Sequence, residues 1–224
     1  MDYPEKSADF TPDTHVSFAP SSIPCHSLTQ DMPSDQHVKA ALALIKDDQS
    51  KVLGLNVGSH KNIQPGQYVP RAGVYPYPPM TRLPSNHPFT DAQSPPELSF
   101  AGLDSSKTYL VVSLDIDAPF PSLGVLGPIL HWIQPGVKVT ESGTLDTTAP
   151  FVANYIGPAP PPGSSPHRYI FFLYEEPAGF DAKAHAPPNG QKLSNWYRMR
   201  YDLDAWANKV NLGSVLAFNY FTSN

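Results

Sequence analysis

Residues 155–169 of this chain read YIGPAPPPGSSPHRY, and the apolar run YIFFLY continues from Tyr169 to Tyr174. The four prolines within residues 158–162 restrict φ and remove backbone donors, so this loop is stiff and cannot be helical. The run after it is rich in aromatic residues, and its lack of polar alternation predicts a strand buried on both faces. A stiff loop that leads straight into a buried strand holds its last residue, His167, in place. His167 is therefore a candidate site residue.

A second predicted strand, YLVVSL at residues 109–114, runs into two aspartates. Asp115 and Asp117 lie two residues apart, so their side chains share one face of the chain. Two carboxylates in one patch repel each other unless a cation, a proton or hydrogen bonds compensate. The pair either caps the following turn and binds an arginine, or it forms part of a binding site at the mouth of the strand.

A third strand is predicted at residues 130–134, LHWIQ, and it contains His131. A histidine on its own is more often structural than catalytic, and this applies to His131 and His167 alike. The remaining histidines are scattered and show no metal-ligand spacing such as H-x-x-x-H. We therefore predict neither a metal ion nor a cofactor.

The composition excludes several classes of protein. Proline accounts for 27 of the 224 residues, which rules out a helical bundle because a proline inside a helix costs about 3 kcal/mol. The net charge of −5 argues against a general nucleic-acid surface, and the single cysteine, Cys25, forbids an internal disulfide. The polar N-terminus does not resemble a signal peptide, and no stretch of about 18 apolar residues is present. We therefore predict a cytoplasmic protein without nucleic-acid binding and without a transmembrane segment.

The remaining pattern predicts a loose N-terminal arm over residues 1–33 and a single β-dominated domain over residues 34–224. The arm is rich in Pro, Ser and Asp and lacks periodicity. Within the domain, apolar residues at helical spacing predict peripheral helices at residues 35–47 and 203–210. Candidate N-caps are Ser34 or Asp35 for the first helix and Asp202 or Asp204 for the second. Further strands are predicted at Val52–Val57 and Leu216–Phe221.

Three motifs occur in an order that resembles the phosphatidylethanolamine-binding protein (PEBP) family. They are DIDAP at residues 115–119, LHW at residues 130–132, and YIGPAPPPG at residues 155–163 followed by PHRY at residues 166–169. The ending AFNYF at residues 217–221 is most similar to the fungal carboxypeptidase Y inhibitor branch. The resemblance implies a mainly β, PEBP-like fold with peripheral α-helices. In that fold a large central antiparallel sheet packs on a smaller sheet, with a few flanking helices.

The family also implies a small anion-binding pocket. Matched motif by motif, its ligand-binding residues fall on Asp115, Asp117, Pro119, His131, Gly157, Pro158 and His167, with a looser match at Tyr220. Imidazole N–H groups at His131 and His167 can donate to phosphate or carboxylate oxygens. Asp115 can orient a histidine. Arg168 is expected to turn inward and pair with Asp117, because an unpaired buried charge is costly.

One segment departs from the family pattern. Where the family usually has polar and basic residues, residues 120–129 read FPSLGVLGPI, without a charge and without an aromatic residue at Ile129. One rim of the pocket is therefore more apolar than is usual in the family. This favours a ligand with an apolar body and one anionic or carbonyl end over a phospholipid head group.

Two kinds of function follow. In the first, the pocket binds a small anionic or carbonyl metabolite and assists its conversion in fungal secondary metabolism, for example the dimerisation of maleic-anhydride polyketide units in nonadride-type biosynthesis. His167 or His131 would be the general base and Asp115 would hold the tautomer, in a lyase-like, cyclase-like or condensing reaction. In the alternative, the protein is a non-catalytic regulator that binds a phospholipid head group, or an inhibitor of a serine carboxypeptidase. A third interpretation is a scaffold whose pocket is vestigial.

Overall fold

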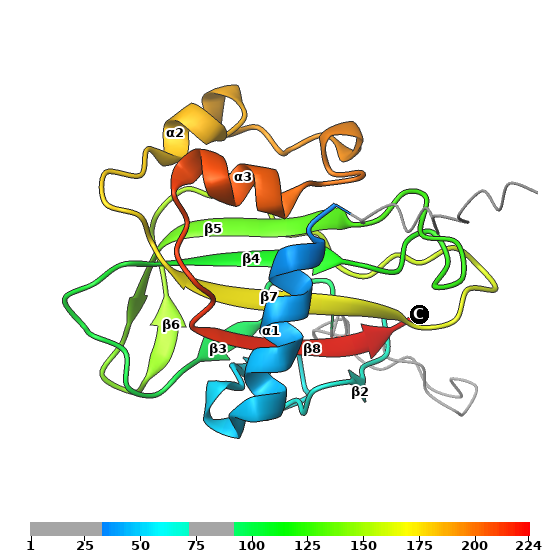
Figure 1. Ribbon diagram of the computed structural model, residues 1–224, viewed down its shortest axis with the longest axis horizontal. Coiled ribbons are helices and arrows are strands. Elements are labelled where there is room, and N and C mark those ends of the chain that lie inside the picture. The colour runs from blue at the N-terminus through cyan, green and yellow to red at the C-terminus, as the bar shows by residue number, and fades with distance from the viewer. Residues whose placement is uncertain (1–32, 72–91) are drawn as a thin grey trace, which may run out of the picture. The chain divides into compact units, whose positions relative to one another are not determined.

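The two apolar runs form neighbouring strands at the centre of one sheet. In the computed structural model, which describes residues 33–71 and 92–224, β4 (Tyr109–Asp115) pairs antiparallel with β7 (His167–Glu175), as Figure 1 shows. Nearly every residue of both strands is buried, as the continuous apolar runs predict. The pairing places the end of β4 beside the beginning of β7, so that Asp115 lies opposite Tyr169.

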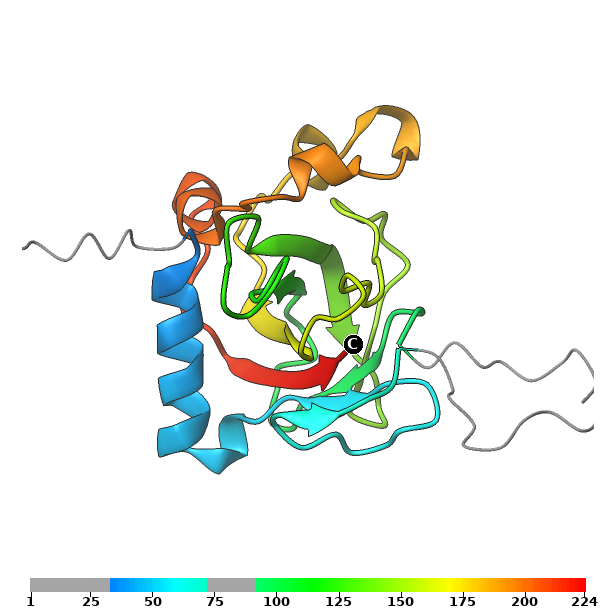
Figure 2. The same ribbon diagram turned by 90° about the vertical axis from the view of Figure 1, so that its right-hand side faces the viewer.

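Six more strands extend this pair into an eight-stranded sheet with the order β1-β3-β6-β5-β4-β7-β8-β2. Their bounds are Gly54–Asn56 for β1, Gln67–Tyr68 for β2, Glu97–Ser99 for β3, Ile129–Val139 for β5, Thr144–Asp146 for β6 and Ala217–Ser223 for β8. Residues 129–137 of β5 pair with β4, and its last two residues pair with β6, so the sheet curls over on itself (Figure 2). The mainly β fold, with a large antiparallel part and a smaller part packed on it, is confirmed.

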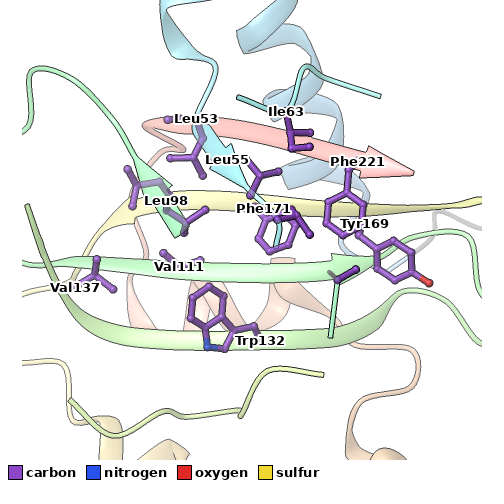
Figure 3. Close-up of a cluster of buried hydrophobic side chains, with 14 of the residues drawn as sticks. Leu53, Leu55, Ile63, Leu98, Val111, Trp132, Val137, Tyr169, Phe171 and Phe221 are labelled. Carbon is purple, nitrogen blue, oxygen red and sulfur yellow. The ribbon is translucent and has the colours of Figure 1, made fainter. Parts of the chain in front are cut away.

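A hydrophobic cluster fills the space inside the curl. Leu55 of β1 and Leu98 of β3 face Val111, Phe171 and Phe221 of the large part of the sheet (Figure 3). All five side chains are buried. The short strands β1, β3 and β6 are therefore held by side-chain burial, which stabilises by about 25 cal/mol per Å² of apolar surface.

Two helices cover the opposite face of the sheet. α1 (Asp35–Asp47) lies across the strands and α3 (Leu203–Val210) lies near its N-terminal end, as Figure 1 shows. Ala41 and Ile45 of α1 and Leu203 of α3 join Phe172 and Phe218 in a second buried cluster. Because side chains alternate along a strand, Phe172 faces this cluster while its neighbour faces the first one.

The two helices cap each other. The carboxylate of Asp204 in α3 accepts hydrogen bonds from two first-turn N–H groups of α1, at 3.0 and 3.1 Å. The hydroxyl of Ser34 accepts from the N–H of Leu203, the first residue of α3, at 2.8 Å. The predicted bounds of the first helix are confirmed, but the predicted cap is wrong, because Ser34 stands at the N-cap position and makes no side-chain hydrogen bond to its own helix. Asp202 caps α3.

Short elements link these parts. They are α2 (Ala182–His185) and three turns of 3₁₀ helix at Gln49–Lys51, Pro188–Gly190 and Asn195–Tyr197. Within residues 33–71 and 92–224, no helix has the length and apolar character needed to cross a bilayer. The predicted N-terminal arm at residues 1–33 falls outside the described residues, apart from Pro33, so the boundary at residue 34 stays a prediction.

Candidate functional site

A cavity of about 290 Å³ opens at the end of the sheet where β4 finishes and β7 begins. Its walls come from residues 115–119 after β4, the first half of β5 with the loop before it, the proline-rich loop before β7, and the segment around residues 195–199. Five of the residues predicted from sequence line it: Asp115, Pro119, His131, Gly157 and His167.

His167 forms a buried hydrogen-bonded chain with two other side chains. Its Nδ1 lies 2.8 Å from Oδ2 of Asp115, and its Nε2 lies 2.8 Å from Oγ of Ser164. The Ser164 hydroxyl donates its own hydrogen to the carbonyl of Ser165 at 2.9 Å, so Oγ accepts from the ring. Both ring nitrogens therefore face acceptors, an arrangement that favours the imidazolium form of His167.

The electrostatic surroundings of His167 agree with this arrangement. Burial lowers its pKa, but the hydrogen bond to Asp115 and the charges of Asp115 and Asp117 outweigh the burial. The pKa of His167 is therefore raised above its ordinary value. Sequence reasoning did not single out Ser164, although its position three residues before the histidine is visible in the motif.

His131 lies at an irregularity in β5. Residues on either side of it pair with consecutive residues of β4, so His131 is an extra residue in the ladder. Bulges of this kind redirect a side chain, and they often lie beside functional sites. Here the ring lines the cavity, and its Nδ1 donates to the carbonyl of Ile156 at 2.7 Å.

His131 has the opposite protonation tendency to His167. Burial lowers its pKa most, the charge of Asp115 and the hydrogen bond to Ile156 oppose this, and the positive charges of Arg198 and His167 lower it further. The net pKa of His131 is below its ordinary value. In the neutral ring Nδ1 carries the hydrogen, so Nε2 carries the lone pair.

The ring of Tyr169 contacts both histidines, so the two imidazoles lie at the same site. Its ring packs edge-on against His131, with centroids 5.0 Å apart, and is stacked with His167 at 6.4 Å. Its hydroxyl is buried and makes no hydrogen bond of ordinary geometry within the described residues, although the Asp115 side chain and the Ala159 backbone lie near it. Burial raises the pKa of this phenol, and so does the nearby charge of Asp115. Sequence reasoning missed Tyr169, which immediately follows the recognised His-Arg pair.

Arg198 is the second residue that sequence reasoning missed. It borders the cavity, and its side chain is fully buried. The guanidinium donates to the carbonyls of Leu130 at 3.0 Å, Asn154 at 3.1 Å and Leu193 at 3.2 Å, and to the side-chain oxygen of Asn154 at 2.8 Å. All of these acceptors are neutral. Burial lowers the pKa of Arg198 to about 10, so it stays charged at neutral pH.

The walls of the cavity carry excess positive charge, although the chain as a whole is acidic. The chain segments that form the cavity walls contain two acidic residues, Asp115 and Asp117. The carboxylate of Asp117 pairs with Arg168 at 2.6 and 2.8 Å. When His167 is protonated, its charge and that of Arg198 exceed the single negative charge of Asp115 by one. The Arg168 side chain is 45% exposed, so it reaches Asp117 from the surface and does not turn inward as the sequence predicts.

Three of the expected ligand residues do not line the cavity. The side chain of Asp117 is occupied by Arg168. Pro158 lies behind the wall, where its carbonyl accepts from the Gln93 amide at 3.0 Å. Tyr220 lies on the other face of the sheet, packed against the second hydrophobic cluster, because the alternation of β8 turns it away from the face that carries His167.

Comparison with known proteins places this arrangement in a family. A family model described as phosphatidylethanolamine-binding protein matches residues 59–221. The chain belongs to the phosphatidylethanolamine-binding protein family. Every residue that lines the cavity lies within the matched segment, so the cavity is part of the PEBP domain.

Two curated relatives match part of the chain. One is a carboxypeptidase Y inhibitor of Saccharomyces cerevisiae, 28% identical over 50% of this chain and 58% of that protein. The other is a phomoidride biosynthesis cluster protein of Talaromyces stipitatus, 31% identical over 52% of this chain and 59% of that protein. The chain thus matches about three fifths of the length of each relative.

Solved PEBP structures share the fold. A carboxypeptidase Y inhibitor, solved in complex with its cognate proteinase, superposes with a TM-score of 0.58 at 21% identity, covering 88% of this chain and 98% of that one. A phosphatidylethanolamine-binding protein from Plasmodium vivax superposes with a TM-score of 0.52 at 15% identity, covering 87% and 98%. At these identities the likeness establishes the fold alone.

Proposed function

We propose that this PEBP-family chain binds a small anionic or carbonyl metabolite in the cavity and assists its conversion by general-base chemistry. The observation that carries the proposal is Arg198, a fully buried cation whose acceptors are all neutral. A desolvated charge without a counter-ion is costly. A ligand anion in the adjoining cavity supplies the missing negative charge.

The hydrogen bonds assign different roles to the two histidines. The neutral ring of His131 offers a lone pair at Nε2, which takes a proton from an acidic C–H of the ligand. In its protonated form, which its acceptors favour, His167 stabilises negative charge that develops on the ligand, together with Arg198. Two titratable groups whose pKa values are pushed apart are the usual arrangement of an acid and a base.

The substrate class follows from the cavity walls and from one relative. Leu126, Ile129 and Met199 give the cavity an apolar side, which suits a ligand with an apolar body. The similar Talaromyces protein is named for a biosynthesis cluster, which supports a role in fungal secondary metabolism. Maleic-anhydride polyketide units, which have acidic C–H groups on the carbons attached to their conjugated double bond, are the example that we propose to test first.

We expect the purified protein to convert such a maleic-anhydride monomer, with products followed by mass spectrometry. Replacing His131 with glutamine, which keeps the hydrogen bond to Ile156 but removes the base, lowers the rate by about 100-fold. His185→Gln is the matched control, because His185 is stacked on Phe180 outside the cavity walls. An unchanged rate in His131→Gln, or no rate above background in the parent protein, contradicts the catalytic proposal.

The alternative is a serine carboxypeptidase inhibitor, and one observation favours it. The Saccharomyces relative bears that name, and the solved neighbour was crystallised with its cognate proteinase. If this role holds, micromolar protein inhibits carboxypeptidase Y, and the His131→Gln variant inhibits equally well. An absence of inhibition at that concentration removes this alternative and leaves ligand binding, including binding of a phospholipid head group, to be measured directly.

A further inference from the structure

Exposed apolar side chains gather at the mouth of the cavity. Among the described residues, seven large hydrophobic side chains are exposed, and six of them lie in two short segments. We call these six the apolar collar: Phe120, Leu123, Val125, Leu126, Trp196 and Tyr197. Single exposed apolar residues are ordinary, whereas a cluster of them marks a contact surface.

The two segments of the collar are joined to each other. The N–H of Arg200 donates to the carbonyl of Leu126 at 3.0 Å, and its guanidinium donates to the carbonyl of Val125 at 3.2 Å. The N–H of Tyr201 donates to the carbonyl of Pro128 at 2.9 Å. These bonds join residues 125–128 to residues 200–201, so the two segments that carry the collar are tied together beside the cavity.

The collar is also continuous with the cavity. Leu126 lines the cavity and is 40% exposed, so one side chain belongs to both surfaces. On the other side, Asn195 and Met199 line the cavity, and the two exposed aromatic residues of the collar lie between them in the sequence. An apolar path therefore leads from the cavity wall to the outside.

The size and charge of the site indicate what lies on this path. A cavity of about 290 Å³ is at the lower end of the range for ligand pockets, so a long molecule must extend beyond its mouth. Residues 118–134 and 186–201 contain no aspartate or glutamate, while the second of these segments carries two exposed cations, Lys192 and Arg200. The site thus combines a positive interior with an apolar exit.

We propose that the apolar collar holds the hydrocarbon chain of a single-chain anionic amphiphile whose charged end occupies the cavity. This inference rests on the proposed function, because it requires the cavity to bind the anionic end. It adds a substrate class, namely a carboxylate or phosphate monoester with an unbranched alkyl chain that leaves the cavity over Leu126. Burial of each methylene against the collar strengthens binding, since a fully buried CH₂ contributes about 0.8 kcal/mol.

Isothermal titration calorimetry with inorganic phosphate and with ethyl, butyl, hexyl and octyl phosphate, each below its critical micelle concentration, tests the proposal. We expect the Kd to fall about twofold per methylene, roughly half the effect in free energy of full burial, because the collar covers the chain from one side. In the double variant Leu123→Ser/Val125→Ser the dependence on chain length flattens, while the Kd for inorganic phosphate reports that the cavity is intact. Tyr68→Ser, which removes the exposed aromatic outside the collar, is the control.

The outcomes separate this proposal from the one on which it rests. Phosphate binding with no dependence on chain length, or a dependence that survives in the double variant, overturns the collar proposal and leaves the anion site standing. Failure of phosphate and of every alkyl phosphate to bind overturns both. Two further measurements identify other occupants of the collar. If the Kd does not depend on chain length and the parent protein, but not the double variant, co-sediments with phosphatidylcholine–phosphatidylserine vesicles, the collar binds a membrane and the proposal is overturned. If the Kd does not depend on chain length and light scattering shows that the parent protein, but not the double variant, dimerises, the collar binds a second copy and the proposal is likewise overturned.

Discussion

Replacing Arg198 with methionine should lower the free energy of unfolding by about 3 kcal/mol and weaken anion binding about a hundredfold. The guanidinium is fully buried and bridges three separate segments through Leu130, Asn154 and Leu193. Methionine fills most of the volume but removes the guanidinium donor from the three carbonyls, at about 1–3 kcal/mol for each that is left unpaired, whereas the side-chain oxygen of Asn154 keeps the N–H of Leu193 as a donor. Removal of a charge that lacks a counter-ion offsets part of that cost, so the net loss is smaller than the sum.

Urea unfolding and phosphate calorimetry measure the two effects separately. Arg200→Met is the matched control, since Arg200 lies two residues away, is exposed and makes one side-chain hydrogen bond, to Val125. It should change stability by less than about 1 kcal/mol. Arg198→Lys keeps the charge but cannot bridge three segments, so it should retain more of the binding than of the stability. Equal stability of Arg198→Met and the parent protein would show that the bridge contributes nothing.

The parts of the fold that depend on local pattern could be predicted from the sequence. The helix at residues 203–210 has the predicted bounds, because its apolar spacing and its capping aspartate, Asp202, lie within a few residues. β4 and β7 follow from uninterrupted apolar runs. In contrast, β5 continues through Pro135 and Gly136 to Val139, beyond the predicted end at Gln134. A register shift between β4 and β5 lets the strand accommodate a proline, and no pattern in the neighbouring sequence indicates this shift.

Site residues could be predicted from the sequence where they lie at the ends of recognisable strands. Asp115 and His167 meet because each lies at the end of a strand that could be recognised, and the two strands pair. Arg198 could not be found in this way, since its partners lie 5 to 68 residues away and the four residues before it are exposed. The misplacement of Tyr220 has a similar origin: the motif gives its position in the strand, but only the register of β8 determines the face on which it lies.

Asp115→Asn should lower the free energy of unfolding by about 3 kcal/mol near pH 6 and by clearly less at higher pH. In the parent protein the pKa of His167 is raised, so the ion pair stabilises the fold below the ordinary pKa of about 6.5 and this contribution is lost as the pH rises through the folded pKa. In the variant, burial lowers the pKa of His167, which reverses the sign of its contribution. The stability difference between the two proteins therefore shrinks as the pH rises.

The titration of each histidine, followed by NMR, checks this explanation directly. Asp115 raises the pKa of both histidines in the parent protein, so both pKa values should fall in Asp115→Asn, and that of His167 should fall further because it loses a hydrogen bond as well as a charge. Asp117→Asn is the matched comparison, two residues along: Asp117 raises the pKa of His167 through its charge alone, without a hydrogen bond to the ring, so that pKa should fall less than in Asp115→Asn. If His167 titrates at the same pH in Asp115→Asn as in the parent protein, Asp115 does not stabilise the imidazolium form of His167. The proposed roles of His131 as the base and His167 as the cation are then contradicted.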